Sequence, residues 1–111
     1  MKRIPLLIAV AITAFGCKMS EDAFVEQYAD AYCTWVEGCG KLAEQFGTLD
    51  DCVTNRTVFA EAELTPSGCD YSPKAAKECI TQIGDNESCD INSAMPESCT
   101  EVSSCFGDTG R

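Results

Sequence analysis

The sequence predicts an all-α fold, a small disulfide-rich bundle of three to four short helices. Apolar residues recur at three- and four-residue steps over several segments of the 111-residue chain, and no alternating run is long enough for a strand. The nine cysteines make up about 8% of the chain, a level typical of a disulfide scaffold. A chain of this length forms one domain.

The first sixteen residues predict an export signal rather than a part of the fold. Lys2 and Arg3 are basic, and a largely apolar run follows over residues 4–15. This run is about 12 residues long, whereas a helix that crosses a bilayer needs about 20. We therefore expect residues 1–16 to be a signal peptide that is removed on export to a compartment where disulfides form.

The bond between Gly16 and Cys17 fits the cleavage patterns of two kinds of signal peptidase. Residues 14–16 match the small-x-small rule of ordinary signal peptidase. Gly16 and Cys17 also resemble the end of a bacterial lipobox, in which the cysteine is lipidated, although Phe15 departs from the small residue that this pattern prefers. Nine cysteines are an odd number, and lipidation of Cys17 leaves eight that can pair. The alternative is an unlipidated Cys17 with a free or intermolecularly bonded thiol.

Lipidation of Cys17 would attach the exported domain to a membrane. In some bacterial lipoproteins an Asp directly after the lipidated cysteine retains the protein at the inner membrane. Lys18 stands at this position here, so the resemblance to lipoproteins implies the outer membrane. The mature chain would carry six basic and 18 acidic side chains, a net charge of −12, which an anionic lipid surface repels. We therefore expect the lipid alone to hold it there.

The first helix is expected from about Ser20 to Gly38. Ser20 is a good N-cap, and Glu21 and Asp22 suit the positive end of a helix dipole. Its apolar residues share one broad face, where the aromatic side chains are expected to form core rather than to line a lipid pocket: Phe24, Val25, Tyr28, Ala29, Ala31, Tyr32, Trp35 and Val36.

A short helical turn over residues 42–46 is expected next, closed by Gly47. Thr48 then begins a second helix, with Asp51 at the capping-box position. Residues 61–63 are expected to fade into a loop. One sector of this helix faces inward: Leu49, Cys52, Val53, Arg56, Phe59 and Ala60.

Two further helices complete the predicted domain, which spans residues 17–106. Ser72 and Pro73 begin one helix and Gly84 ends it. Its inner stripe is Ala76, Cys79, Ile80 and Ile83. A short helix starts at Pro96 with three inward residues, Cys99, Val102 and Phe106, and residues 107–111 form a flexible tail.

Eight cysteines are expected to form four disulfides: Cys33, Cys39, Cys52, Cys69, Cys79, Cys89, Cys99 and Cys105. Eight cysteines allow 105 pairings, and the sequence does not choose among them. Cys33 and Cys39 would lie about 9 Å apart along a helix axis. This exceeds the limit of about 7 Å between bridged α-carbons, so each should bond another segment.

Composition excludes several function classes. The chain has no His, which excludes Ser-His-Asp and Cys-His catalysis and His-ligated zinc. The formal charge of −10 argues against nucleic acid as a partner. The cysteines lack zinc-ligand spacing, and the acidic loop over residues 85–92 lacks calcium-loop spacing. We expect no metal, no cofactor and no catalytic residue; a hydrolase using paired carboxylates is the one catalytic alternative.

The chain combines Gly16-Cys17 with the segment from Tyr32 to Cys39, residues 75–80, and Cys89 with Pro96 and Cys99. In this combination it resembles small cysteine-rich lipoproteins of myxobacterial type. It implies a location in the cell envelope and no particular activity. The sequence thus predicts a non-catalytic, lipid-anchored envelope protein with a binding or structural role, for which a protein is the candidate partner. The alternative is a freely secreted cysteine-rich effector or inhibitor.

Overall fold

The computed structural model describes residues 18–64, 68–90 and 93–105. The predicted signal peptide, Cys17, Phe106 and the predicted tail lie outside the described residues. The described residues contain helices and one isolated β-bridge, between Tyr71 and Ser103, but no strand. The predicted all-α, disulfide-rich fold is confirmed. The helices are α2 (Glu21–Gly38), α3 (Leu42–Gln45), α4 (Leu49–Leu64), α5 (Pro73–Asp85) and α6 (Glu97–Thr100).

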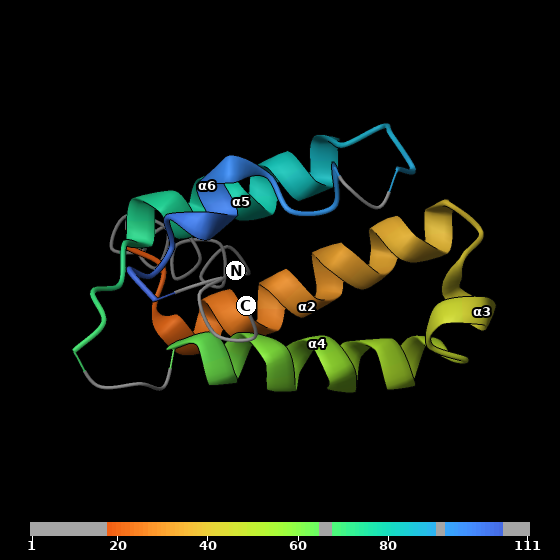
Figure 1. The fold of residues 1–111 in the computed structure, drawn as a ribbon, viewed down its shortest axis with the longest axis horizontal. Coiled ribbons are helices and arrows are strands. Elements are labelled where there is room, and N and C mark those ends of the chain that lie inside the picture. The colour runs from red at the N-terminus through yellow and green to blue at the C-terminus, as the bar shows by residue number, and fades with distance from the viewer. Residues whose placement is uncertain (1–17, 65–67, 91–92, 106–111) are drawn as a thin grey trace, which may run out of the picture.

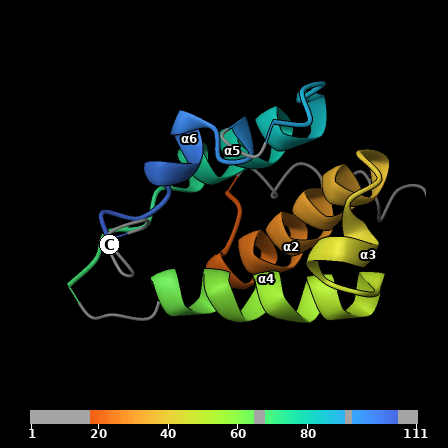
Figure 2. The same cartoon turned by 45° about the vertical axis from the view of Figure 1, so that its right-hand side comes forward.

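Helix α2 is the central element of the bundle (Figures 1 and 2). Helix α4 packs antiparallel against one side of α2, after the chain has reversed through α3. Helix α5 packs against the other side, with α6 beside it. The C-terminal ends of α2 and α5 therefore lie at the same end of the molecule. None of the helices described is both long and apolar enough to cross a membrane.

Three hydroxyl side chains begin the long helices, as predicted. The Ser20 Oγ accepts a hydrogen bond from the Ala23 N–H at 3.1 Å, and the Ser72 Oγ accepts one from Ala75 at the same distance. The Thr48 Oγ1 accepts one from the Asp51 N–H, also at 3.1 Å. Each bond satisfies one of the N–H groups that a first helical turn leaves without a partner.

Two expectations for α4 were wrong. Leu49 is 41% exposed, because it is the first residue of the helix and side chains lean toward the helix N-terminus, which carries it past the packed surface. The helix also does not fade at residue 61. It continues to Leu64, and Glu63 is only 3% exposed, since it lies three residues after the buried Ala60 on the same face.

The end of α5 also differs from the expectation. Gly84 lies inside the last turn rather than after it, and the helix runs to Asp85. Among the described glycines, only Gly40, Gly47 and Gly68 have the positive φ that favours glycine. Helix α5 ends instead at Asn86, whose backbone is extended at φ −72° and ψ 116°.

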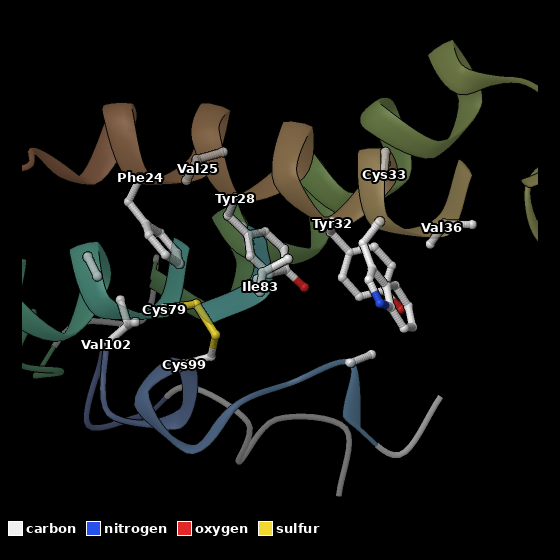
Figure 3. Packing of buried hydrophobic residues seen from close by; sticks show 14 of the residues in the cluster. Phe24, Val25, Tyr28, Tyr32, Cys33, Val36, Cys79, Ile83, Cys99 and Val102 are labelled. Atoms are coloured by element: carbon white, nitrogen blue, oxygen red, sulfur yellow. A yellow bond between two sulfur atoms is a disulfide. The ribbon is translucent and has the colours of Figure 1, made fainter. Parts of the chain in front are cut away.

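The core consists of one aromatic and aliphatic cluster centred on α2 (Figure 3). Phe24 and Tyr28 are fully buried, and their rings stack at 5.6 Å between centroids. They meet Ile83 of α5 and Val102, which follows α6. Burying these side chains supplies the main attraction between the helices.

Four disulfides join the eight cysteines of the described residues. Cys33–Cys52 connects α2 to α4, and Cys79–Cys99 connects α5 to α6. The other two are Cys39–Cys89 and Cys69–Cys105. As predicted, Cys33 and Cys39 each bond a segment outside α2. Four disulfides indicate an oxidising, exported environment.

Only one of the four bridges joins the two halves of the described chain. Cys33–Cys52 lies within residues 18–64, whereas Cys69–Cys105 and Cys79–Cys99 lie within residues 68–105. Cys39–Cys89 alone links the α2–α4 half to the α5–α6 half.

Candidate functional site

A groove of about 430 Å³ lies between the C-terminal half of α2 and the end of α5. Its α2 wall includes Ala31 and Trp35, and its α5 wall includes Ile83 and Gly84. This volume is in the range that small-molecule sites occupy. Two parallel helix ends and the loop after α5 thus form the candidate binding site.

The Cys39–Cys89 disulfide lines one end of the groove. Next to it, the Trp35 indole Nε1–H donates to the Ser88 carbonyl oxygen at 2.8 Å, and Trp35 is 9% exposed. The Lys41 ammonium donates to the Cys89 carbonyl oxygen at 3.3 Å. These three ties hold the loop after α5 against the end of α2. Trp35 therefore belongs to the core, as expected, and also lines the groove.

The loop after α5 is ordered by its own side chains. The Asn86 carboxamide oxygen accepts from the Ser88 N–H at 3.0 Å, and its amide nitrogen donates to the Ser93 carbonyl at 3.1 Å. The Ser88 hydroxyl oxygen accepts from the Asp90 N–H at 3.1 Å. Such short-range bonds fix a loop conformation without regular secondary structure.

The charged lining of the groove is acidic. Among the described residues that line it, only Asp30 on α2 and Glu87 in the loop are charged, and both are exposed. Thr34 adds a hydroxyl group. An apolar wall with carboxylates at the edge is suited to a partner group that combines apolar surface with a positive charge or hydrogen-bond donors.

A second polar cluster lies between α2 and α4 and is structural. The Arg56 guanidinium carbon lies 5.0 Å from the centroid of the Tyr32 ring and 4.4 Å from that of Phe59. Its Nη1 donates to the Tyr28 hydroxyl oxygen at 3.4 Å, and this hydroxyl donates to the Met95 sulfur at 3.6 Å. Arg56 thus faces inward, as predicted, with its charge over two aromatic faces.

Burial raises the pKa of two tyrosines. Burial raises the pKa of Tyr28 to about 12, while the nearby Arg56 guanidinium opposes this rise. Burial also raises the pKa of Tyr71 to about 12, and the Glu21 carboxylate adds to the effect. The Tyr71 hydroxyl donates to the Met19 carbonyl oxygen at 2.7 Å, which ties the segment before α2 to the start of α5.

We expect Tyr28 and Tyr71 of the folded protein to ionise near pH 12 rather than near 10. The unfolded chain loses the Tyr28 proton near pH 10, so stability is complete below pH 10 and falls between pH 10 and 12. For Tyr28 the slope is up to about 1.4 kcal/mol per pH unit. Tyrosinate absorbance followed against pH, with and without denaturant, measures both values. Tyr28→Phe should remove one late-ionising group; ionisation of every phenol near pH 10 in the folded protein would contradict the expectation.

The acidic loop over residues 85–90 gathers no metal site. In the part of the chain that the structure describes, no three His, Cys, Asp or Glu side chains are grouped so that they could hold a metal ion. The predicted disulfide cysteines all lie in bridges, and Cys17 lies outside the described residues.

Sequence reasoning missed three contributors to this arrangement. Glu63 continues the spacing of Cys52, Arg56 and Ala60, so the helical period itself could have found it. Met95 and the Ser88 carbonyl come from loops, where no period operates. Comparisons with protein-family models, curated proteins and solved structures found no match for this chain.

Proposed function

We propose that the protein is a non-catalytic, lipid-anchored protein of the bacterial cell envelope, held at the outer membrane through Cys17, that acts by binding a partner. The resemblance to small cysteine-rich lipoproteins of myxobacterial type belongs to the same proposal. The export signal over residues 1–16 and the cysteine at its end support the location.

The pairing of the cysteines is the observation that best supports a lipid anchor on Cys17. The chain has nine cysteines, and eight of them pair among themselves in four disulfides. None of these eight needs Cys17 as its partner. An exported protein seldom keeps an unpaired thiol. Lipidation would convert the Cys17 thiol to a thioether and leave the four disulfides unchanged.

A binding role suits the groove between α2 and α5. The chain has no imidazole base, and the thiols of the described residues are consumed in disulfides. The groove offers an apolar wall and the Asp30 and Glu87 carboxylates, so a basic, partly apolar side chain of a protein partner is the group it fits.

The state of Cys17 tests this proposal directly. The full sequence is expressed in a bacterium, and the mature protein is analysed by intact mass after reduction and thiol alkylation. A lipidated protein should take up eight alkyl groups, carry the added mass of acyl chains, and fractionate with the outer membrane. Nine alkyl groups and no acyl mass would overturn the anchor and favour the freely secreted alternative.

A Cys17→Ser variant is the matched control. It should also take up eight alkyl groups after reduction, because the eight cysteines of the four disulfides remain, but it should carry no acyl mass and leave the membrane fraction. This experiment tests the anchor alone, and its outcome does not depend on binding in the groove.

A further inference from the structure

Three of the five basic residues among those described surround one shallow hollow. Lys18, Lys74 and Lys77 line it together with Pro73 and Glu78, and its volume is about 500 Å³. These three lysines are called the lysine face below. In a chain with a net charge of −10, this is a local concentration of positive charge.

Specific contacts bring Lys18 to this face. The Tyr71 hydroxyl donates to the Met19 carbonyl oxygen at 2.7 Å, with the Ser20 carbonyl oxygen 3.1 Å away. Tyr71 precedes the first turn of α5 by only two residues. Figure 2 shows the segment before α2 rising to the layer of α5 and α6. The packing therefore sets Lys18 beside Lys74 and Lys77, which are far from it in sequence.

The lysine face is available to a partner. The Lys74 side chain is 88% exposed, and its amino group lies 3.6 Å from the Glu78 carboxylate, 49% of whose side chain is exposed. Lys77 is exposed as well. One carboxylate against three ammonium groups leaves the hollow with a net positive charge. An exposed pair of this kind holds its partners weakly.

The acidic residues nearest to Lys18 in sequence line a different hollow. Glu21 and Asp22 lie with Glu61 and Leu64 on the α4 side of α2. The far end of α2 is about 27 Å away along an 18-residue helix. At physiological salt, charges are screened over about 8 Å. The acidic residues toward the far end of α2 are thus screened from the lysine face.

We propose that the lysine face lies on the anionic phospholipid headgroups of the membrane that holds the anchor, and that it sets the orientation of the domain. This rests on the proposed anchor, because Lys18 follows Cys17 directly and their α-carbons are about 3.8 Å apart. The lipid therefore enters the membrane next to the lysine face. Positive charges this close to an anionic leaflet are attracted, and the acidic remainder of the domain points away.

The proposal revises the expectation that the acidic domain is simply repelled by an anionic surface. The net negative charge of the domain is repelled by anionic lipid as long as the whole domain is far from the membrane. The anchor instead holds one face of the domain within a screening length of the lipid, where the charge of that face decides the interaction. The orientation leaves the groove between the C-terminal ends of α2 and α5 away from the anchored end of α2.

Lysine acetylation on vesicles tests the orientation. The mature chain is produced unlipidated with its disulfides closed, and the free thiol of Cys17 is coupled to a maleimide phospholipid. Vesicles contain phosphatidylcholine alone or with about one-third phosphatidylglycerol. We expect Lys18, Lys74 and Lys77 to react about fivefold more slowly on the anionic vesicles, the factor for one lysine held at such a surface. About 0.5 M salt should restore their rates.

Lys41, at the other end of α2, is the internal control and should react equally on both vesicles. A Lys74→Gln variant should reduce the slowing at Lys77, whereas Lys41→Gln should not. Equal rates at the lysine face on both vesicles, or slowing at Lys41 instead, would overturn the proposal. Because the anchor is attached chemically, this result is independent of whether the cell lipidates Cys17.

Discussion

Reduction of all four disulfides is expected to unfold the domain at 25 °C. The bridges close loops of 19, 50, 36 and 20 residues in sequence separation. Loop-closure entropy assigns each about 3–4 kcal/mol, about 14 kcal/mol together. The loops overlap, so this figure is an upper value. Half of it would still remove most of the stability of a domain this size, at about 0.1 kcal/mol per residue.

The measurement is far-ultraviolet circular dichroism of the protein with and without reductant, followed by alkylation to prevent reoxidation. We expect the helical signal and any cooperative thermal transition to disappear together. The oxidised protein treated with the same alkylating agent is the control. A reduced and alkylated chain that keeps its helical signal and melts cooperatively would show that packing alone holds the bundle.

Removal of Cys39–Cys89 alone is expected to give the largest loss of loop-closure entropy among the single bridges. A Cys39→Ala, Cys89→Ala variant opens the loop with the longest sequence separation, 50 residues, which corresponds to about 4 kcal/mol. This bridge is also the only covalent link between the two halves of the described chain apart from the backbone. We therefore expect the groove to widen, with the Trp35–Ser88 hydrogen bond weakened.

Urea unfolding measures the free energy, and Trp35 fluorescence reports on the groove. A Cys33→Ala, Cys52→Ala variant is the comparison, since its loop of 19 residues corresponds to about 3 kcal/mol. Cys33 and Cys52 are fully buried, so their loss also leaves a cavity, whereas Cys39 and Cys89 are at least partly exposed. A loss below about 1 kcal/mol without Cys39–Cys89 would show that the two halves hold each other through packing.

Helix starts could be predicted from the sequence because they depend on adjacent residues. Ser20, Thr48 and Ser72 cap the predicted helices through bonds to the residue three positions later. The inward face of α2 followed the helical period for the same reason. Both kinds of signal are local, and the structure retains them.

What the sequence could not predict depends on contacts between distant segments. The choice of Cys89 as the partner of Cys39 follows from α5 lying parallel to α2, which no local pattern encodes. The groove arises at the same contact and was likewise not foreseen. Glu63 differs from these, because it continues the helical spacing of the buried face of α4 and its burial is a local signal.

The uneven distribution of crosslinks along α2 has a mechanical consequence. Cys33 is bridged to α4 and Cys39 follows the helix end, whereas the first three turns are held by packing and by the Tyr71 hydroxyl. A pulling force at the N-terminus would therefore peel α2 from its first residue and stop at Cys33. The sixteen Cα-to-Cα steps from Cys17 to Cys33 extend to about 55 Å at most, so the covalent chain up to the first disulfide limits how far the domain can move from its anchor.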